Sequence, residues 1–143
     1  MWRWLRWVAA GAAALLLAAQ FVPYGRAHDN PPISAEPEWD SAATRALAVR
    51  ACFDCHSNET RWPWYSNVAP MSWLIQRDVD EGREELNWSE WTPQRAEDAE
   101  EYSEVLLEGS MPPWTFEVLH GEARLSDAEI DALLAGFRAT FGR

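Results

Sequence analysis

Both cysteines of this 143-residue chain fall within one short window, Cys52-Phe53-Asp54-Cys55-His56. The two thiols stand three positions apart, and a histidine follows the second directly. Two cysteines are too few for a disulfide-rich scaffold or for an all-cysteine zinc site. The pattern Cys-x-x-Cys-His therefore constrains the chain most, because few kinds of chemistry use this spacing.

The window matches the motif that attaches haem in c-type cytochromes. Two thiols at this spacing, at a helix end, can each form a thioether with one vinyl group on adjacent edges of a porphyrin. The following histidine is then held beneath the iron, where an imidazole nitrogen is the usual proximal ligand. We therefore expect one covalent haem c, held by Cys52, Cys55 and His56.

Three other interpretations of the window stay open. A thioredoxin-like redox pair uses the same cysteine spacing, but it needs a strand–helix–strand context that the sequence does not predict. A plain Cys52–Cys55 disulfide would close a small loop in an oxidising compartment. A metal site could combine His56 with His28 or His120, although the spacing matches no zinc pattern.

The sixth iron position needs a further donor, and the chain offers four candidates: Met111, Met71, His120 and His28. We expect Met111, which lies in the proline-stiffened run Ser110-Met111-Pro112-Pro113-Trp114. A thioether on such a loop could face the far side of the haem, and it raises the reduction potential relative to a second histidine. A position that is open or filled by water is the remaining alternative.

The haem carboxylates need hydrogen-bond donors, and Arg and Trp side chains supply them well. Arg61, Trp62 and Arg83 are candidates, although a surface ion pair is the commoner use of any single arginine on an acidic surface. Seven of the ten tryptophans follow residue 27. We expect these rings to pack on the haem or on one another.

Residues 1–27 predict a signal peptide or a membrane anchor. Arg3 and Arg6 precede residues 7–22, which carry no charge. Sixteen helical residues span about 24 Å, which is short of a hydrocarbon core of about 30 Å. Aromatic residues bracket the run, so we favour a retained transmembrane helix, in the membrane through residues 1–24, over cleavage after Ala27.

The charge of the chain is unevenly distributed. The chain has twelve arginines and 23 acidic residues, for a net charge of −11. Three of the arginines lie in residues 1–27. The part after residue 27 therefore has nine arginines and a net charge of −14. This charge argues against a nucleic-acid partner and favours a redox protein with a basic docking surface. The basic N-terminus predicts a domain on the periplasmic face of the bacterial cytoplasmic membrane, or free in the periplasm after cleavage.

The exported part predicts a mainly α fold, with a proline-rich linker at residues 28–39 and the haem-binding domain at residues 40–143. Helices are expected at residues 41–50, 70–86 and 93–108, and from Ser126, which forms a capping box with Glu129. Gly109 suits the end of the third helix. Residues 57–69 and 110–125 predict loops, the latter because two adjacent prolines exclude a helix interior. No segment predicts a strand.

Several segments around the motif resemble the haem-binding domain family of bacterial exported proteins. They are residues 52–70, with Cys-x-x-Cys-His-Ser-Asn and Trp-Pro-Trp-Tyr-Ser, and residues 22–26, 30–32, 72–74, 82–87, 89–91 and 111–113. The resemblance covers about residues 20–137. It implies a membrane-anchored or periplasmic single-haem c-type cytochrome, with Cys52 and Cys55 as thioether positions, His56 as proximal ligand and Met111 at the Met-Pro position. Family members tend to have His-Pro after the Met-Pro loop, whereas this chain has His120-Gly121, so the resemblance assigns His120 no role.

These observations predict a small cytochrome-c-like helical domain that carries single electrons. No acid–base dyad is evident, so an electron carrier is expected rather than an enzyme. One alternative is a haem-based sensor or ligand-binding module with a labile sixth ligand. Others are a peroxidase-like enzyme that uses His120, and an anchor protein with a plain disulfide and no haem.

Overall fold

The computed structural model describes residues 2–142, except for the side chains of residues 98 and 99. Its α-helices are α1 (Trp2–Ala19), α2 (Ala42–Ala51), α3 (Phe53–His56), α4 (Met71–Glu85), α5 (Ala99–Leu107), α6 (Trp114–Leu119) and α7 (Asp127–Phe141). Three 3₁₀ turns connect them: η1 (Trp64–Asn67), η2 (Pro93–Asp98) and η3 (Gly121–Ala123). β-pairing within residues 2–142 is limited to a parallel bridge between Ala35 and Glu90. The fold is therefore mainly α, as predicted.

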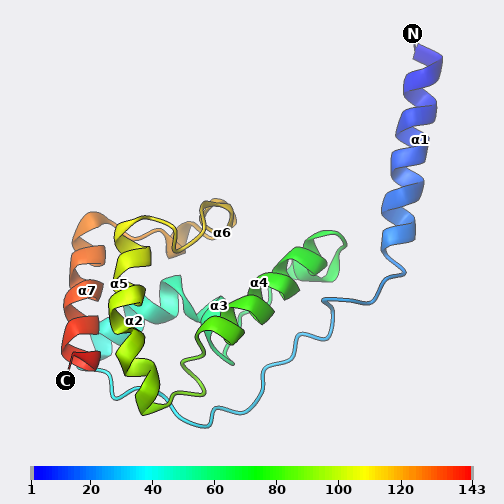
Figure 1. Ribbon diagram of the computed structural model, residues 1–143. Helices are drawn as coiled ribbons and strands as arrows, with labels where there is room; N and C mark the ends of the chain where they lie inside the picture. Colours follow the sequence, from blue (N-terminus) through cyan, green and yellow to red (C-terminus); the bar gives the residue numbers. More distant parts are fainter. Residues whose placement is uncertain (1, 143) are drawn as a thin grey trace.

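Helices α2, α5 and α7 pack together at one end of the molecule, and α3 leads from them to α4 (Figure 1). Helices α2 and α7 approach closely where Gly136 meets Thr44. Glycine permits this approach, since a side chain at position 136 would collide with the threonine. An ion pair between Arg50 and Glu129 also joins these two helices, at 2.6 Å. The segment between α2 and α4, which contains the motif, is thus tied to a packed helical base.

An aromatic cluster fills the core beside the motif. Trp88 is 2% exposed, and its ring lies 5.3 Å from Phe53 and 5.4 Å from Trp39 between centroids. Phe137 and Phe141 of α7 extend the cluster. Aromatic rings bury much apolar area per residue, and a domain of this size needs such area for stability. Some of the tryptophans thus pack on other aromatic rings.

Most of the predicted helices are confirmed. Ser41 caps α2 by accepting a hydrogen bond from the Thr44 amide at 3.1 Å. Helix α4 begins directly after Pro70, and the capping box of Ser126 and Glu129 opens α7. The third predicted helix differs at its start, because residues 93–98 form the 3₁₀ turn η2 before α5 begins. Gly109 follows α5 with φ of 69°, a left-handed conformation that glycine adopts readily.

The loop predicted at residues 110–125 is wrong in part, because it contains α6 and η3. The adjacent prolines do exclude a helix interior, but Pro113 occupies the cap position before the first turn. Proline is compatible with that position because the first amides of a helix have no partner within it. Residues 57–69 likewise contain a single 3₁₀ turn, η1.

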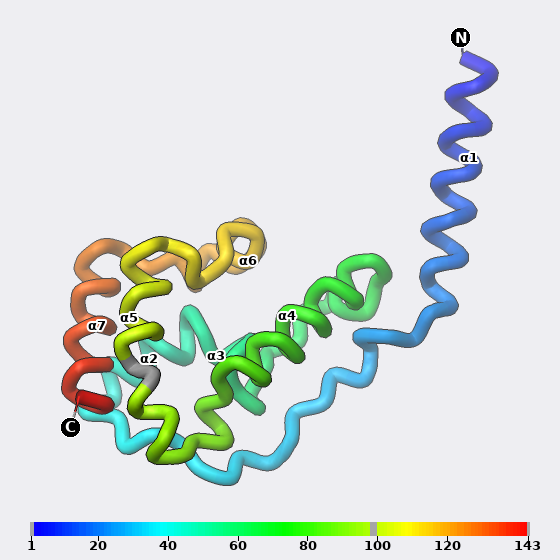
Figure 2. The backbone as a smooth tube through the Cα atoms, viewed as in Figure 1, coloured from blue at the N-terminus to red at the C-terminus, as the bar shows by residue number. Residues whose placement is uncertain are grey.

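Helix α1 projects away from the other helices, and none of its residues is buried (Figure 1). Within residues 2–142, no helix combines the length and the apolar character needed to cross a membrane. The predicted transmembrane helix is therefore unsupported. After α1 the chain runs along the helical body to α2 (Figure 2).

The capping box of α7 predicts a specific loss of stability in acid. The Ser126 amide, Arg50 and the Ser126 hydroxyl lower the pKa of Glu129 from 4.5 to about 2. The lowered pKa means that the ionised carboxylate stabilises the fold fully above pH 4.5, and that this contribution is lost as the pH falls from 4.5 towards 2. Urea unfolding of Glu129→Gln should therefore show a smaller loss of stability across this range than the wild type.

Ser126→Ala, which removes the cap hydroxyl, should lower the free energy of unfolding by about 1 kcal/mol at neutral pH. Asp131→Asn is the control, since it removes an exposed carboxylate from the same helix. Equal acid sensitivity of Glu129→Gln and the wild type would contradict this role of the capping box.

Candidate functional site

The Cys-x-x-Cys-His window forms the turn between α2 and α3. Cys52 ends α2, and its amide donates to the Ala48 carbonyl at 2.8 Å. The Cys52 carbonyl then accepts the amides of Cys55 and His56 at 3.1 and 3.0 Å, so the motif is one tight helical turn. Both cysteines are free, and each residue as a whole is partly buried. The helix-end position expected for the two thiols is confirmed.

The imidazole of His56 is oriented by α4. Its Nδ1 lies 2.8 Å from the Gly82 carbonyl and 3.2 Å from the Leu86 carbonyl. A carbonyl can only accept, so Nδ1 carries the proton and Nε2 retains its lone pair. Burial lowers the pKa of His56, which keeps the ring neutral. A neutral, oriented imidazole with a free Nε2 is the form that binds a metal ion.

Close contact between α3 and α4 makes this orientation possible. Gly82 is buried, and a methyl group there would lie 2.7 Å from the Cys55 carbonyl oxygen and 3.0 Å from the Cys55 Cβ. The amide of Trp88, just after α4, donates to the His56 carbonyl at 2.9 Å. His56 is therefore fixed at both its ring and its backbone.

The two thiols are not activated as nucleophiles. Burial and, to a lesser extent, nearby Cys55 raise the pKa of Cys52 to about 12. Burial also raises the pKa of Cys55 to about 12, with contributions from Asp78 and Asp54. Redox-active Cys-x-x-Cys pairs have a lowered thiol pKa. The raised pKa values of both thiols therefore disfavour the thioredoxin-like interpretation.

A polar network joins the residues after the motif to those after α4. Ser89 Oγ accepts the Asn58 amide at 2.9 Å, and Asn87 Nδ2 donates to Asn58 Oδ1 at 2.8 Å. Ser57, Asn58 and Ser89 are buried. Buried polar groups that are fully paired fix one arrangement of the chain, because any other arrangement leaves some of them unpaired. The network thus joins two segments that lie about thirty residues apart in sequence: the one directly after the motif and the one directly after α4.

The predicted carboxylate-binding residues all have protein partners. Arg61 forms a two-pronged pair with Asp54 of the motif, at 3.0 and 2.8 Å. Trp62 Nε1 donates to Asn30 Oδ1 at 3.3 Å. Arg83 donates to the Ser57 carbonyl and to three groups of Asp29, Asn30 and Thr60. These side chains position the motif, and the structure offers other donors to a bound carboxylate.

Trp73, which is partly buried, and Trp88, which is buried, are such donors. The indole N–H groups of Trp73 and Trp88 have no hydrogen-bond partner among the described residues. Trp88 lies beside the motif, with its ring centroid 6.4 Å from that of His56. A buried donor without an acceptor costs about 1–3 kcal/mol, so a bound carboxylate could stabilise either position. Apart from the high tryptophan content, the sequence carries no signal that singles out these two rings.

Two histidines considered for the sixth position are engaged elsewhere. His120 Nε2 lies 2.9 Å from the Tyr65 hydroxyl, and its Nδ1 lies 3.1 Å from the Phe116 carbonyl. His28 stacks on Trp62 at 4.7 Å, and its Nε2 lies 2.9 Å from Ser66 Oγ. Ligation through either nitrogen of His120, or through Nε2 of His28, would break these hydrogen bonds. The pairing of Tyr65 with His120 ties the segment after α6 to η1.

Met111 stands on the loop between α5 and α6. The amides of Ser110 and Met111 both donate to the Val105 carbonyl, at 3.1 and 3.2 Å, which fixes the start of the loop. The Met111 residue is 39% exposed and borders a pocket of about 110 Å³ together with Trp114 and Leu125. Met71 is partly buried at the first turn of α4. The role of Met111 as a ligand stays a prediction.

Large apolar side chains remain exposed on two segments near the motif in sequence or in space. Trp64 belongs to η1, Leu74 to α4, and Val68 to the turn between them. Helix α4 packs against both α3 and η1. Trp114, Val118 and Leu119 belong to α6, which Tyr65 and His120 connect to η1. Large apolar side chains that remain exposed on connected segments are candidates for a binding surface.

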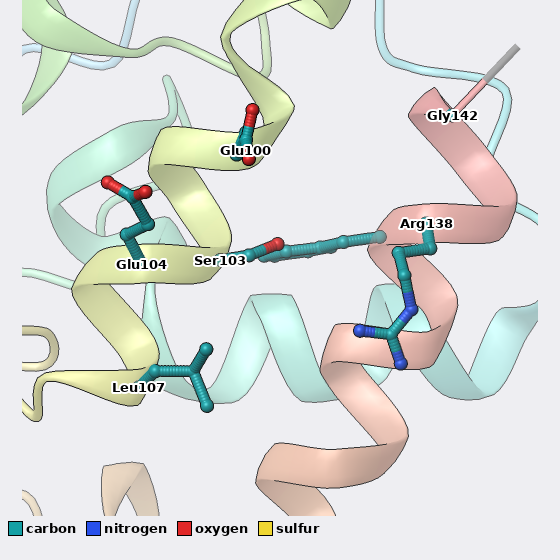
Figure 3. A pocket seen from close by; sticks show the side chains of 7 residues that line it. Glu100, Ser103, Glu104, Leu107, Arg138 and Gly142 are labelled. Atoms are coloured by element: carbon teal, nitrogen blue, oxygen red, sulfur yellow. The ribbon is translucent and has the colours of Figure 1, made fainter.

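The groove in Figure 3 lies elsewhere, between α5 and α7, and has a volume of about 490 Å³. Its lining residues are Glu100, Ser103, Glu104, Leu107, Phe137, Arg138 and Gly142. No motif residue is among them. Within residues 2–142, no three His, Cys, Asp or Glu side chains gather as a metal site, so the interpretation with His28 or His120 has no support there.

The structure is thus a helical domain whose Cys-x-x-Cys-His turn presents two free thiols and an oriented imidazole. The family model of the haem-binding domain matches residues 14–139. The chain belongs to this haem-binding domain family, and the resemblance found in the sequence is confirmed. Comparison with curated proteins and with solved structures found no match to the chain.

Gly82→Ala tests the contact on which the His56 orientation depends. The added methyl group should push α4 away from Cys55 and lengthen the bond from His56 Nδ1 to the Gly82 carbonyl. We expect a loss of about 1–3 kcal/mol in unfolding free energy, together with a lower haem content of the purified protein.

Gly121→Ala is the matched control, because a methyl group there meets no atom within 4 Å. Urea unfolding and the haem-to-protein absorbance ratio measure the two effects. Equal unfolding free energies and equal haem contents in Gly82→Ala and Gly121→Ala would show that α3 and α4 do not need this close contact.

Proposed function

We propose that the chain is an exported single-haem c-type cytochrome that transfers single electrons. The observation that carries this proposal is the Cys-x-x-Cys-His turn, in which α4 holds the proton of His56 on Nδ1 and leaves Nε2 free. Cys52 and Cys55 would hold the haem through thioethers, and His56 would be the proximal ligand. Haem supplies an iron that changes its oxidation state by one electron.

The surroundings of the motif suit an electron carrier because they are rigid. The network of Ser57, Asn58, Asn87 and Ser89 and the aromatic core both resist rearrangement. A ligand sphere that stays the same in both oxidation states lowers the reorganisation that accompanies electron transfer. The haem carboxylates would find donors at the indole groups of Trp73 and Trp88.

Covalent attachment is tested by expressing the full chain together with a bacterial haem-maturation system. We expect haem staining on a denaturing gel for the wild type. Cys52→Ala and Cys55→Ala should each retain one thioether at most, and the double variant should lose all staining. Absence of staining in the wild type, with the protein exported and folded, would falsify covalent attachment.

Met111 is the proposed sixth ligand. Met111→Ala should lose the far-red sulfur-to-iron absorption band of the oxidised protein, and its reduction potential should fall, because methionine raises the potential of haem iron. Met71→Ala is the matched control and should retain the band. An unchanged band in Met111→Ala would exclude this ligand.

The spectra also separate the alternative functions. A sensor or ligand-binding module would bind carbon monoxide or cyanide rapidly in the wild type, because its sixth position is open or labile. A peroxidase-like enzyme would need His120 free near the iron, whereas both nitrogens of His120 have partners in the structure. The electron carrier is therefore the function that the site supports best.

We propose that residues 1–27 direct export, which brings the thiols to the compartment where bacteria attach haem. The proposed location is the periplasmic side of the cytoplasmic membrane. The basic residues Arg3 and Arg6 and the exposed apolar side chains of α1 support an association with the membrane.

The proposed partner is a redox protein with a basic docking surface. The part of the chain after residue 27 has a net charge of −14, so long-range attraction should speed the encounter. Raising the ionic strength should slow electron exchange with a basic redox protein, as measured by stopped-flow absorbance. A rate independent of salt would count against electrostatic docking.

A further inference from the structure

Residues 20–30, hereafter the docked segment, lie against η1 and the first turns of α4. Gln20 makes two hydrogen bonds to the backbone of one residue there. Its Nε2 donates to the Ala69 carbonyl at 2.9 Å, and its Oε1 accepts the Ala69 amide at 3.1 Å. Ala69 is 2% exposed. A side-chain amide that pairs with both groups of one peptide position replaces the contact that a neighbouring strand would make.

The middle of the docked segment depends on a glycine. Gly25 is buried, its φ is 78°, and a side chain there would collide with the Ser72 carbonyl. Only glycine adopts this left-handed conformation without strain, and only glycine permits this close approach. Arg26 Nη2 donates to Gln20 Oε1 at 3.0 Å, and Tyr24 donates to Asp80 at 3.3 Å.

The far end of the docked segment meets the residues that follow the motif. The ring of His28 stacks on Trp62, and Asn30 Nδ2 donates to the Thr60 carbonyl at 2.9 Å. Arg83 donates to Asn30 Oδ1 and to the Asp29 carbonyl, both at 3.0 Å. The docked segment is therefore continuous with the polar network that holds the motif.

Cleavage after Ala27 would remove Gln20 and Gly25 from these contacts. Gly25 stands at the small-residue position before such a cleavage site, and the structure buries it against α4 instead of leaving it accessible. The match to the haem-binding domain family begins at residue 14, so it includes the docked segment. Both observations place residues 20–27 in the domain and not in a removable leader.

We propose that the chain is not processed after Ala27, and that the surface formed by η1 and the start of α4 is the docking site for residues 20–30 of the same chain. Helix α1 is then a permanent element that leaves the domain beside the start of α4 (Figures 1 and 2). This inference uses no property of the haem, and it holds whether or not the iron has Met111 as a ligand.

The first test is the mass of the mature protein. The full chain is expressed with export and haem maturation, purified, and measured by intact-mass spectrometry with N-terminal peptide mapping. We expect a chain that retains residues 20–27 and α1. A mature N-terminus at or near residue 28 would overturn the proposal, and haem staining of the same sample reports separately on the proposed function.

The second test asks whether the segment is docked. Trypsin cleavage after Arg26 requires this segment to leave the domain, so its rate follows the population of the undocked form. Gly25→Ala should increase that rate about tenfold or more, because an L-residue is strained at this φ. Gly11→Ala is the matched control, since a methyl group there meets no atom within 4 Å.

Gln20→Ala keeps the proposal testable if Gly25→Ala fails to accumulate. It removes the two hydrogen bonds to Ala69 without any steric clash, and it should also speed cleavage after Arg26. Equal cleavage rates in Gln20→Ala, Gly11→Ala and the wild type would show that residues 20–30 are not docked, and would overturn the proposal.

Discussion

The hydrogen bonds between His56 and α4 are the interaction on which the rest of the site depends. They require α4 to lie against the motif, and Gly82 permits that approach because it has no side chain. The same contact brings the chain after α4 back to the His56 carbonyl. The ring is thereby neutral, oriented and free at Nε2 before any ligand binds. Preorganisation of this kind removes the cost of ordering a histidine when a metal ion binds to it.

The motif is held from two sides by different physical means. On one side, α2 and α7 cross closely and enclose an aromatic core that reaches Trp88 and Phe53. On the other side, paired polar groups connect Asn58 to the segment after α4. Apolar packing supplies most of the stability of a small domain, whereas a satisfied polar network selects one arrangement.

The hydrogen-bond donors near the motif differ in the structure from those that residue type alone would suggest for a bound carboxylate. Arginine is a good partner for carboxylates, but Arg61 and Arg83 are committed to Asp54 and to backbone groups. The indole of Trp88 is buried without a partner beside His56, and it is the more available donor. In the docked segment, too, polar groups pair with protein partners: His28 with Ser66 of η1, Tyr24 with Asp80 of α4, and Gln20 with Ala69 between them. Whether a donor already has an acceptor within the protein, more than its residue type, decides whether it remains for a ligand.

The sequence by itself determined the local features. The motif, the caps at Ser41 and Ser126 and the helices that they begin depend on residues within one or two turns, so their spacing could be read directly. The family could be read as well, because its motifs are contiguous. Only the tertiary structure decided that Gly82 and Leu86 orient His56, that His120 pairs with Tyr65, and that residues 20–30 pack on α4. These contacts join residues 26 to 55 positions apart, and no local pattern specifies them, because they form only when packing brings distant segments together.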